Sequence, residues 1–359
     1  GHRGADRVSA FYLYNATMAA KNILVTGGND GIGLALCKVL AVKHGAKVFM
    51  GTRSMERGAN GLKTITDEHP DAAKSIEIIN IDVSDDASVK AAAESLKSKG
   101  VTLYALVNNA GLGFRTGGMD GNKEVMDSML NVNFYGPKRV SDAFLPLIDP
   151  KGRIVNVSSG AASMWLRNQT DDIKKAFTSG DTTWDQLEKL VKEEAAKIPG
   201  DKGGGYGPSK AGLTAYTLQQ AKAHPNMVIT SLSPGFIETK MTSGFGAKLT
   251  PEEGTVSYIK CLFGDVLTGQ YYGSDGLRSP MTVTRDPGTP EYQVSCPEVD
   301  GSPDLPCRVL SWSVKRFVAY NETCRTASRV CRLRGCASLS PFLFVCQGEE
   351  NPDASKYNK

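Results

Sequence analysis

The sequence contains no long hydrophobic run and only a small surplus of positive charge. No stretch of about 18 or more apolar residues occurs, so we predict no transmembrane helix. Residues 1–17 lack the apolar segment of a secretory signal peptide, and we therefore expect a cytoplasmic protein. The 42 Lys and Arg residues against 38 Asp and Glu leave a net charge of +4, which gives no electrostatic case for nucleic acid. Neither a membrane nor a nucleic acid is expected as a partner.

Cysteine is scarce until residue 294. Only Cys37 and Cys261 precede that point, whereas six cysteines lie in residues 294–347. A disulfide or metal module there is disfavoured, because this segment has no Cys-x-x-Cys pair and no histidine; a disordered interaction tail is a second hypothesis. We favour a retained intron. The two ends of the segment 294–347 can be encoded by splice-donor and splice-acceptor consensus sequences, and removal of its 54 codons keeps the reading frame.

Both ends of the chain are expected to lie outside the folded domain. The first methionine is Met18, directly before a predicted strand, so residues 1–17 are expected to be a disordered extension of non-native or upstream sequence. The segment 294–347 is also expected to be disordered, and 348–359 form a polar C-terminal tail. Residues 18–293 then form a single domain.

Apolar segments alternate with helical patterns from residue 22 onward. The apolar segments, which predict strands, are 22–26, 47–50, 76–81, 103–107, 153–157, 227–232 and 269–272. The predicted helices include 34–43, 85–99, 122–146, 207–223 and 251–263. This alternation predicts an α/β fold, a three-layer doubly wound parallel sheet of the Rossmann type. Ligands of such sheets bind at the carboxyl ends of the strands.

A glycine-rich turn, Thr26-Gly-Gly-Asn-Asp-Gly-Ile-Gly33, joins the first predicted strand to a helix. Glycines there permit close backbone approach to a pyrophosphate, and the helix N-terminus supplies free N–H groups, so a dinucleotide site is predicted. The second strand ends in Gly51-Thr52-Arg53-Ser54, with no acidic residue to bind a ribose diol. Arg53 suits a 2′-phosphate instead, which favours NADP(H) over NAD. Asp82, at the end of the third strand, is a candidate adenine contact.

Tyr206 and Lys210 are four residues apart and therefore share one face of a predicted helix. A lysine ammonium beside a phenol favours the tyrosinate and lowers the phenol pKa from its usual value of about 10. We therefore predict a tyrosine suited to general acid–base chemistry.

Six motifs between about residues 20 and 285 resemble, in order, those of the short-chain dehydrogenase/reductase family. They are Thr26–Gly33, Asn108–Gly111, Asn133–Gly136, Ser158-Ser159, Tyr206–Lys210 and Pro234–Thr239. The resemblance implies NADPH-dependent reduction of a small-molecule ketone, aldehyde or quinone. It makes Tyr206 the general acid and Ser159 the group that polarises the carbonyl, with Ser158 as a neighbouring candidate. It also implies that Lys210 holds the nicotinamide ribose and that Asn133 supports a water linking Lys210 to solvent.

The same resemblance implies a set of cofactor-binding residues after the ends of successive strands. They are Gly27, Asn29, Gly31, Ile32, Gly33, Arg53, Asp82, Val83, Asn109, Ala110, Gly111, Tyr206, Lys210, Pro234, Gly235, Ile237 and Thr239. Thr239 matches the position that contacts the carboxamide, and Pro234 and Gly235 would let the chain pass close to the nicotinamide. No metal is expected.

Ser159 and Tyr206 are 47 residues apart, more than is usual in the family. We predict a helical insert over about 163–204, with helices at 171–178 and 183–197. It resembles the insert of the carbonyl reductase subgroup, which covers a helix face that other members use for oligomerisation. A monomer is therefore implied; a surface loop without effect on assembly is the alternative.

Two positions depart from this subgroup. Asp30 stands where a basic residue is common, which removes one partner for a 2′-phosphate, and Phe236 stands where tryptophan is common. The preferred carbonyl therefore stays open. Candidate pocket-lining residues are Leu112, Phe114, Trp165, Phe236 and Met241, although ordinary packing explains each of them equally well.

Two other functions are compatible with the motifs. The first is the reverse reaction, oxidation of an alcohol with NAD(P), since the cofactor pool sets the direction. The second is a cofactor-sensing regulator without turnover. It is disfavoured because such a protein would be expected to lose Tyr206 or Lys210, and both are present.

Overall fold

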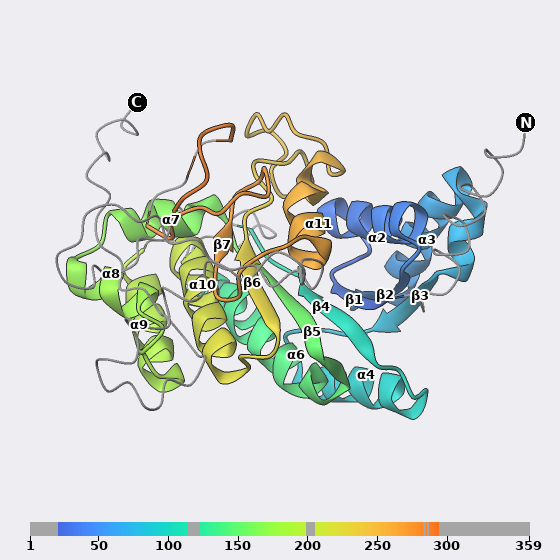
Figure 1. Ribbon diagram of the computed structural model, residues 1–359, viewed down its shortest axis with the longest axis horizontal. Helices are drawn as coiled ribbons and strands as arrows, with labels where there is room; N and C mark the ends of the chain where they lie inside the picture. Colours follow the sequence, from blue (N-terminus) through green and yellow to red (C-terminus); the bar gives the residue numbers. More distant parts are fainter. Residues whose placement is uncertain (1–20, 114–122, 199–204, 283–284, 286, 294–359) are drawn as a thin grey trace, which may run out of the picture. The chain divides into compact units, whose positions relative to one another are not determined.

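The computed structural model describes residues 21–113, 123–198, 205–282, 285 and 287–293. In these residues strands and helices alternate along the chain (Figure 1). The predicted extension 1–17, the segment 294–347, the tail 348–359 and the candidate residue Phe114 lie outside the described residues. The boundaries given for those segments stay predictions.

Seven strands form one parallel sheet in the described part of the chain. They are β1 (Asn22–Thr26), β2 (Lys47–Thr52), β3 (Ile76–Asn80), β4 (Leu103–Asn108), β5 (Ile148–Val157), β6 (Val228–Leu232) and β7 (Tyr271–Tyr272). Their order is β3-β2-β1-β4-β5-β6-β7, and each neighbouring pair is parallel. The strand order reverses between β1 and β4, the point at which such sheets bind ligands. The predicted doubly wound parallel sheet is confirmed.

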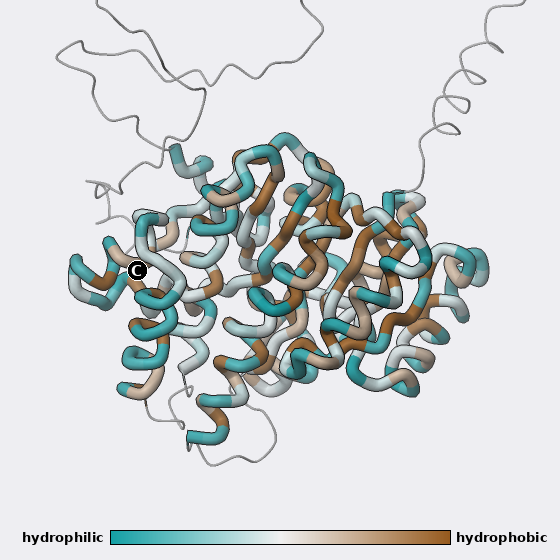
Figure 2. The backbone as a smooth tube through the Cα atoms, turned by 90° about the horizontal axis from the view of Figure 1, so that it is seen from below, coloured by the Kyte–Doolittle hydropathy of each residue, from teal (hydrophilic) through white to brown (hydrophobic). Residues whose placement is uncertain are grey.

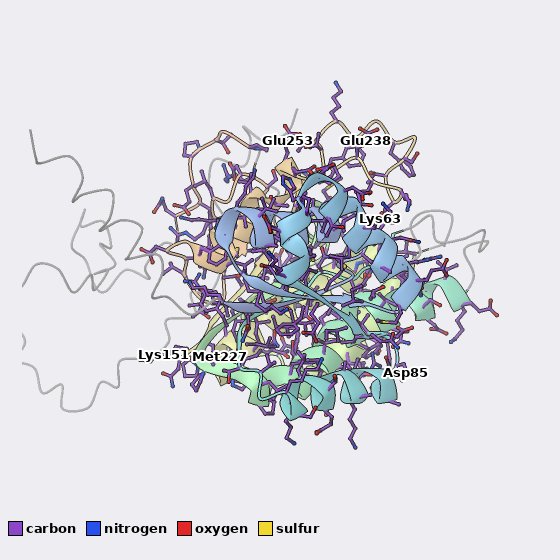
Figure 3. All side chains as sticks on the ribbon, turned by 90° about the vertical axis from the view of Figure 1, so that its right-hand side faces the viewer. Lys63, Asp85, Lys151, Met227, Glu238 and Glu253 are labelled. Atoms are coloured by element: carbon purple, nitrogen blue, oxygen red, sulfur yellow. The ribbon has the colours of Figure 1, made fainter. Side chains whose placement is uncertain are left out.

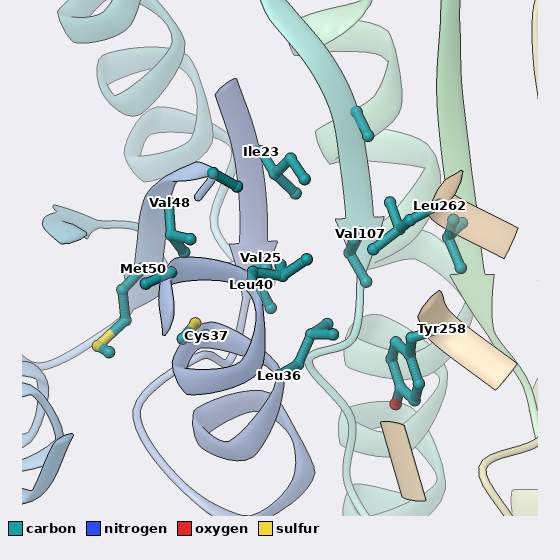
Figure 4. Close-up of a cluster of buried hydrophobic side chains, with 14 of the residues drawn as sticks. Ile23, Val25, Leu36, Cys37, Leu40, Val48, Met50, Val107, Tyr258 and Leu262 are labelled. Carbon is teal, nitrogen blue, oxygen red and sulfur yellow. The ribbon is translucent and has the colours of Figure 1, made fainter. Parts of the chain in front are cut away.

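Helices cover both faces of the sheet. They are α2 (Gly31–His44), α3 (Met55–Glu68) and α11 (Val256–Phe263) on one face, and α4 (Asp86–Ser98), α6 (Gly136–Phe144) and α10 (Tyr206–Ala223) on the other. Ile23 and Val25 of β1 pack with α2 and α11 (Figure 4), whereas Leu24 between them packs with α4 and α6. Figure 3 shows Lys63 of α3 and Asp85, which caps α4, on opposite sides of the sheet.

Because both faces are covered, the strands carry nearly continuous apolar residues, drawn brown in Figure 2. In β4, for example, four of the six residues are buried hydrophobic ones, with no alternation of polar residues. This burial explains why runs of apolar residues identified most of the strands from the sequence.

The insert forms a smaller core of its own against α10. It contains α7 (Gly160–Arg167), α8 (Asp171–Thr178) and α9 (Trp184–Ala196), and Phe177, Leu187 and Val191 are fully buried there. A capping box opens α9: the Thr183 hydroxyl accepts from the Gln186 N–H, and the Gln186 side chain accepts from the Thr183 N–H. The two predicted insert helices are found within one residue of their expected bounds.

Several elements differ from the prediction: β5 begins at Ile148 rather than at 153, and α11 begins at Val256 rather than at 251. The helix expected over 122–146 is divided into α5 (Lys123–Leu130), a π-helical turn at Asn131–Tyr135, and α6. Such turns insert one extra residue into a helix and recur at functional sites. The strand expected over 269–272 shortens to Tyr271–Tyr272, because Gly269 adopts a left-handed turn with φ 73°.

Substitution of Leu36 tests the packing of α2 on the sheet. It is 0% exposed, so Leu36→Ala should lower the free energy of unfolding by about 2–5 kcal/mol, through lost burial and the cavity left behind. Urea unfolding followed by circular dichroism measures this change. Val42 on the same helix is 40% exposed, so Val42→Ala serves as the control and should shift the value by less than about 0.5 kcal/mol. Equal effects of the two substitutions would contradict the packing described.

Candidate active site

The carboxyl ends of β1, β4, β5 and β6 are neighbours in the sheet (Figure 1). β1 continues into the glycine-rich turn, β4 into Asn109–Gly111, β5 into Ser158-Ser159, and β6 into Ser233–Gly235. Parallel strands end at the same edge, so four segments far apart in the sequence meet there.

The turn between β1 and α2 requires glycine at three positions. Gly27 and Gly31 have φ angles of 64° and 54°, in the left-handed region. A Cβ on Gly33 would lie 2.2 Å from the Gly27 carbonyl oxygen and 2.6 Å from Nδ2 of Asn109, so a side chain there would displace the backbone. α2 starts at this turn, with its free N–H groups and positive dipole end. A turn of this shape suits an anionic diphosphate.

A carboxylate already stands at this helix end. Asp30 caps α2, and its Oδ1 accepts a hydrogen bond from the Gly31 N–H at 2.9 Å. Its other oxygen pairs with Nζ of Lys240 at 2.6 Å. The lysine thus offsets the negative charge that Asp30 brings to the edge of the site.

The Thr26 hydroxyl ties the glycine-rich turn to the end of β4. It accepts from the N–H groups of Asn109 and Ala110, both at 3.0 Å, and donates to the Val107 carbonyl at 3.3 Å. Asn108, just before, faces away from the turn: its amide donates to Ser141 and Asn156 inside the fold. Asn109 rather than Asn108 therefore lies on the site.

The ends of β2 and β3 carry the residues predicted to hold the adenosine part of a cofactor. Arg53 is exposed and, among the described residues, makes no ion pair. The Asp82 carboxylate is occupied locally, accepting from the Ser84 N–H at 2.9 Å and the Ser84 hydroxyl at 2.5 Å. Val83 is buried, with its side chain close to Gly136.

Tyr206 stands at the start of α10, beside Ser159, which caps α7. A hydrogen bond joins the Tyr206 and Ser159 side chains. Ser158 is turned inward instead: its hydroxyl contacts the Lys210 carbonyl at 3.0 Å and the Thr214 hydroxyl at 2.7 Å. The two neighbouring serines are thus distinguished, with Ser159 at the tyrosine and Ser158 within the packing of α10.

Lys210 and Asn133 both lie close to Gly111. A Cβ on Gly111 would be 3.3 Å from both Nζ of Lys210 and Oδ1 of Asn133. Lys210 is 4% exposed, and its Nζ donates to the Val157 carbonyl at 2.8 Å. The amide of Asn133, in the π-helical turn, bonds both the N–H (2.8 Å) and the carbonyl (2.9 Å) of Leu112. The turn that interrupts the predicted helix thereby directs Asn133 to the site.

Burial dominates the ionisation of the tyrosine and the lysine. It lowers the pKa of Lys210 to about 8, since the ammonium loses its hydration. It also raises the pKa of Tyr206, against the smaller lowering by the Ser159 hydrogen bond. The sequence predicted a lowered pKa for Tyr206, and the net direction is the opposite in this structure because burial dominates. Nζ lies 6.0 Å from the phenol ring centroid and donates to a backbone carbonyl instead.

The segment after β6 returns to the glycine-rich turn. Gly235 has φ 94°, and a Cβ there would lie 3.0 Å from Cβ of Ser274. The Thr239 methyl would be 3.4 Å from a Cβ on Gly31, so these two predicted cofactor residues are neighbours. The Ile237 side chain is instead buried against Gly254.

The remaining predicted cofactor residues flank the turn. Asn29 and Ile32 are both partly buried. The backbone of Asn29 packs against Gly61 of α3, and Ile32 packs on the core below the turn. Pro234, between Ser233 and Gly235, is partly buried at the end of β6.

Exposed apolar side chains gather on the segment between β6 and α11. They are Phe236 (50% exposed), Met241 (38%), Phe245 (41%) and Leu249 (37%). Met241 also meets Gly113 after β4, which places it near the predicted Leu112. The sequence prediction missed Phe245 and Leu249. Both are large apolar residues between the Pro-Gly motif and the next predicted helix, and this position could have indicated them. Trp165 packs with Phe177 in the insert, at 5.3 Å between ring centroids.

No helix in the described residues is long and apolar enough to cross a membrane.

Residues 21–170 match the family model described as short chain dehydrogenase. The chain is 33% identical over 271 residues to (+)-neomenthol dehydrogenase of Arabidopsis thaliana, covering 66% of this chain and 89% of the relative. It is 30% identical over 244 residues to carbonyl reductase (NADPH) 1 of Homo sapiens, covering 64% and 86% respectively.

Two solved structures have the same fold. Salutaridine reductase from Papaver somniferum superposes with a TM-score of 0.60 at 25% identity, covering 70% of this chain and 99% of that one. The NADPH-bound carbonyl reductase from chicken fatty liver gives a TM-score of 0.52 at 26% identity, covering 72% and 98%.

Proposed function

This chain belongs to the short-chain dehydrogenase family of oxidoreductases, and from that premise we propose that it reduces a carbonyl compound to an alcohol with NADPH. The proposal rests on one observation above all: Tyr206, Ser159 and Lys210 meet where β5 and β6 end. NADPH supplies the hydride when it is bound. The side chains of the protein hold the substrate oxygen and supply the proton.

Tyr206 is the proposed proton donor. Because burial raises its pKa, the phenol is protonated at neutral pH and its proton can pass to the oxygen that gains charge as the carbonyl is reduced. Ser159, bonded to Tyr206, can donate a hydrogen bond to the same oxygen. The Lys210 ammonium would stabilise the tyrosinate left behind, and Asn133 would support the route by which that proton is replaced.

The cofactor is proposed to be NADPH rather than NADH. An exposed Arg53 without an ion pair in the described residues can bind a 2′-phosphate through its guanidinium group. The Asp30 carboxylate would repel the 2′-phosphate, but the Lys240 ammonium, 2.6 Å from this carboxylate, neutralises its charge. The names of the human and chicken relatives, both of which cite NADPH, support the same choice.

The substrate is proposed to be an apolar carbonyl compound. The segment between β6 and α11 exposes Phe236, Met241, Phe245 and Leu249, side chains whose transfer from water to an apolar substrate is favourable. Ketones of the terpenoid kind fit such a surface better than charged sugars or acids. The name of the Arabidopsis relative, a neomenthol dehydrogenase, agrees with this class.

A monomer is proposed. α8 and α9 pack on α10, so the insert covers that helix. None of the large exposed hydrophobic residues of the described chain lies on α5, α6, α9 or α10. Those four helices therefore offer little apolar surface for a second copy, and Met164 on α7, 58% exposed, is the large exposed hydrophobic residue of the described insert helices.

A panel of carbonyl compounds tests the reaction. The full chain should oxidise NADPH, followed by its absorbance, in the presence of menadione, isatin or a monoterpenoid ketone. Tyr206→Phe should reduce this rate by at least about 100-fold, because the general acid is lost, while NADPH still binds. Tyr104→Phe, which removes a hydroxyl that donates to the Leu262 carbonyl, is the control and should retain the rate. Activity retained in Tyr206→Phe would refute the assigned acid.

Arg53 determines the cofactor preference in this proposal. Arg53→Ala should raise the KM for NADPH by about tenfold or more and leave the KM for NADH unchanged, because only NADPH carries the 2′-phosphate. Steady-state kinetics with both cofactors measure the ratio, and Arg57→Ala, on the first turn of α3, is the matched control. A wild-type preference for NADH, or equal effects on both cofactors, would contradict the role of Arg53.

The pH dependence follows from Lys210. Its pKa of about 8 means that the ammonium is charged below pH 8 and neutral above it. The tyrosinate formed during reduction loses its stabilising charge as the pH rises, so kcat/KM for the carbonyl at saturating NADPH should be level at acidic to neutral pH and fall through about 8. Lys210→Met should be slow throughout. A flat profile in the wild-type enzyme across this range would count against the role of Lys210.

A further inference from the structure

Tyr258, in the first turn of α11, reaches the glycine-rich turn from inside the fold. Its side chain is 0% exposed and packs with β1 and α2 (Figure 4). Its hydroxyl donates a hydrogen bond to Oδ1 of Asn109 at 2.9 Å, across 149 positions of sequence. Neither the motifs nor the reaction proposed above accounts for this contact.

The other end of the Asn109 amide holds the glycine-rich turn. Its Nδ2 donates to the carbonyls of Thr26 at 2.9 Å and Gly27 at 3.3 Å. A primary amide has one accepting oxygen and one donating NH2 group. If the amide rotated by half a turn, its oxygen would face two carbonyl oxygens and its NH2 group would face the tyrosine. The two carbonyls therefore fix the orientation in which the NH2 group bonds the turn, and the Tyr258 hydroxyl holds the opposite end of the amide by donating to its oxygen.

This orientation bears directly on the shape of the turn. Gly27 has a φ angle of 64°. Nδ2 of Asn109 lies only 2.6 Å from the position that a Cβ on Gly33 would take. The amide thus fills the gap between the end of β1 and the start of α2. The N–H groups at that helix end can bind a diphosphate only while the turn holds this shape.

Tyr258 acts through Asn109 and does not move a proton. Burial raises the pKa of its phenol well above the usual range, so the hydroxyl remains a donor. That hydroxyl donates to Oδ1 of Asn109. The residue is therefore placed to position the turn and is separate from the group that supplies the proton.

We propose that Tyr258 is a positioning residue for cofactor binding, which anchors the oxygen of the Asn109 amide and, through that amide, holds the glycine-rich turn in the shape that binds the diphosphate. The inference rests on the proposed function in one respect, that a nicotinamide dinucleotide binds at this turn. Because the diphosphate is common to NADPH and NADH, the effect of Tyr258 should be the same for both.

Removal of the hydroxyl alone tests this role. In the full chain, Tyr258→Phe should raise the Kd of NADPH and of NADH by about fivefold each, the loss expected for one hydrogen bond, as measured by fluorescence titration. At saturating NADPH its kcat should stay within about twofold of wild type, since no transition-state contact is lost. The matched control is Tyr272→Phe, which removes a hydroxyl from a residue 2% exposed that accepts a bond from the Leu267 N–H.

The outcomes separate this inference from the proposed function. Similar melting temperatures for the two variants, with weaker cofactor binding only in Tyr258→Phe, would support the positioning role. An unchanged Kd in Tyr258→Phe would overturn it while leaving the proposed function standing, and so would equal weakening in both variants. If the wild-type chain bound neither NADPH nor NADH, the proposed function would fail and the inference with it.

Discussion

The hydroxyl group of Thr26 joins the ends of β1 and β4, and both parts of the candidate site depend on this contact. It is 1% exposed and accepts hydrogen bonds from two successive N–H groups, those of Asn109 and Ala110. The glycine-rich turn leaves from one of these strands, and the segment to Gly111 leaves from the other. A shift between the strands would therefore move the anion-binding turn relative to Lys210 and Asn133, which both lie close to Gly111.

The buried lysine is costly for the fold and is held by a backbone carbonyl. An ammonium taken from water must recover its hydration through hydrogen bonds, and the Val157 carbonyl at 2.8 Å supplies one. The depressed pKa of Lys210 indicates that this recovery is incomplete. Asn133, which also lies close to Gly111, is held by two bonds to the backbone of Leu112. The polar groups that the proposed chemistry needs are thus built into the packing between β5, α10 and the π-helical turn.

The sequence predicted those features that depend on neighbouring residues. Apolar runs identified the strands because both sheet faces are buried, and the local helical pattern of the insert predicted α8 and α9 within one residue. Features that depend on distant residues were not predictable. The π-helical turn, the bond from Tyr258 to Asn109 and the pair between Asp30 and Lys240 each require the fold to be known. The pKa of Tyr206 was predicted in the wrong direction, since helical spacing gives the nearness of a charge but not the extent of burial.

The segment between β6 and α11 connects the two halves of the site. It starts beside the Pro234–Gly235 turn, brings Thr239 against Gly31, exposes the apolar side chains proposed to meet the substrate, and ends three residues before Tyr258. Exposed phenylalanine and methionine are unfavourable in water and contribute nothing to the core, so their retention here is better explained by an apolar partner at this surface. The same segment leads into α11, whose Tyr258 bonds the Asn109 side chain. The proposed substrate and cofactor would therefore both bind against one continuous piece of chain.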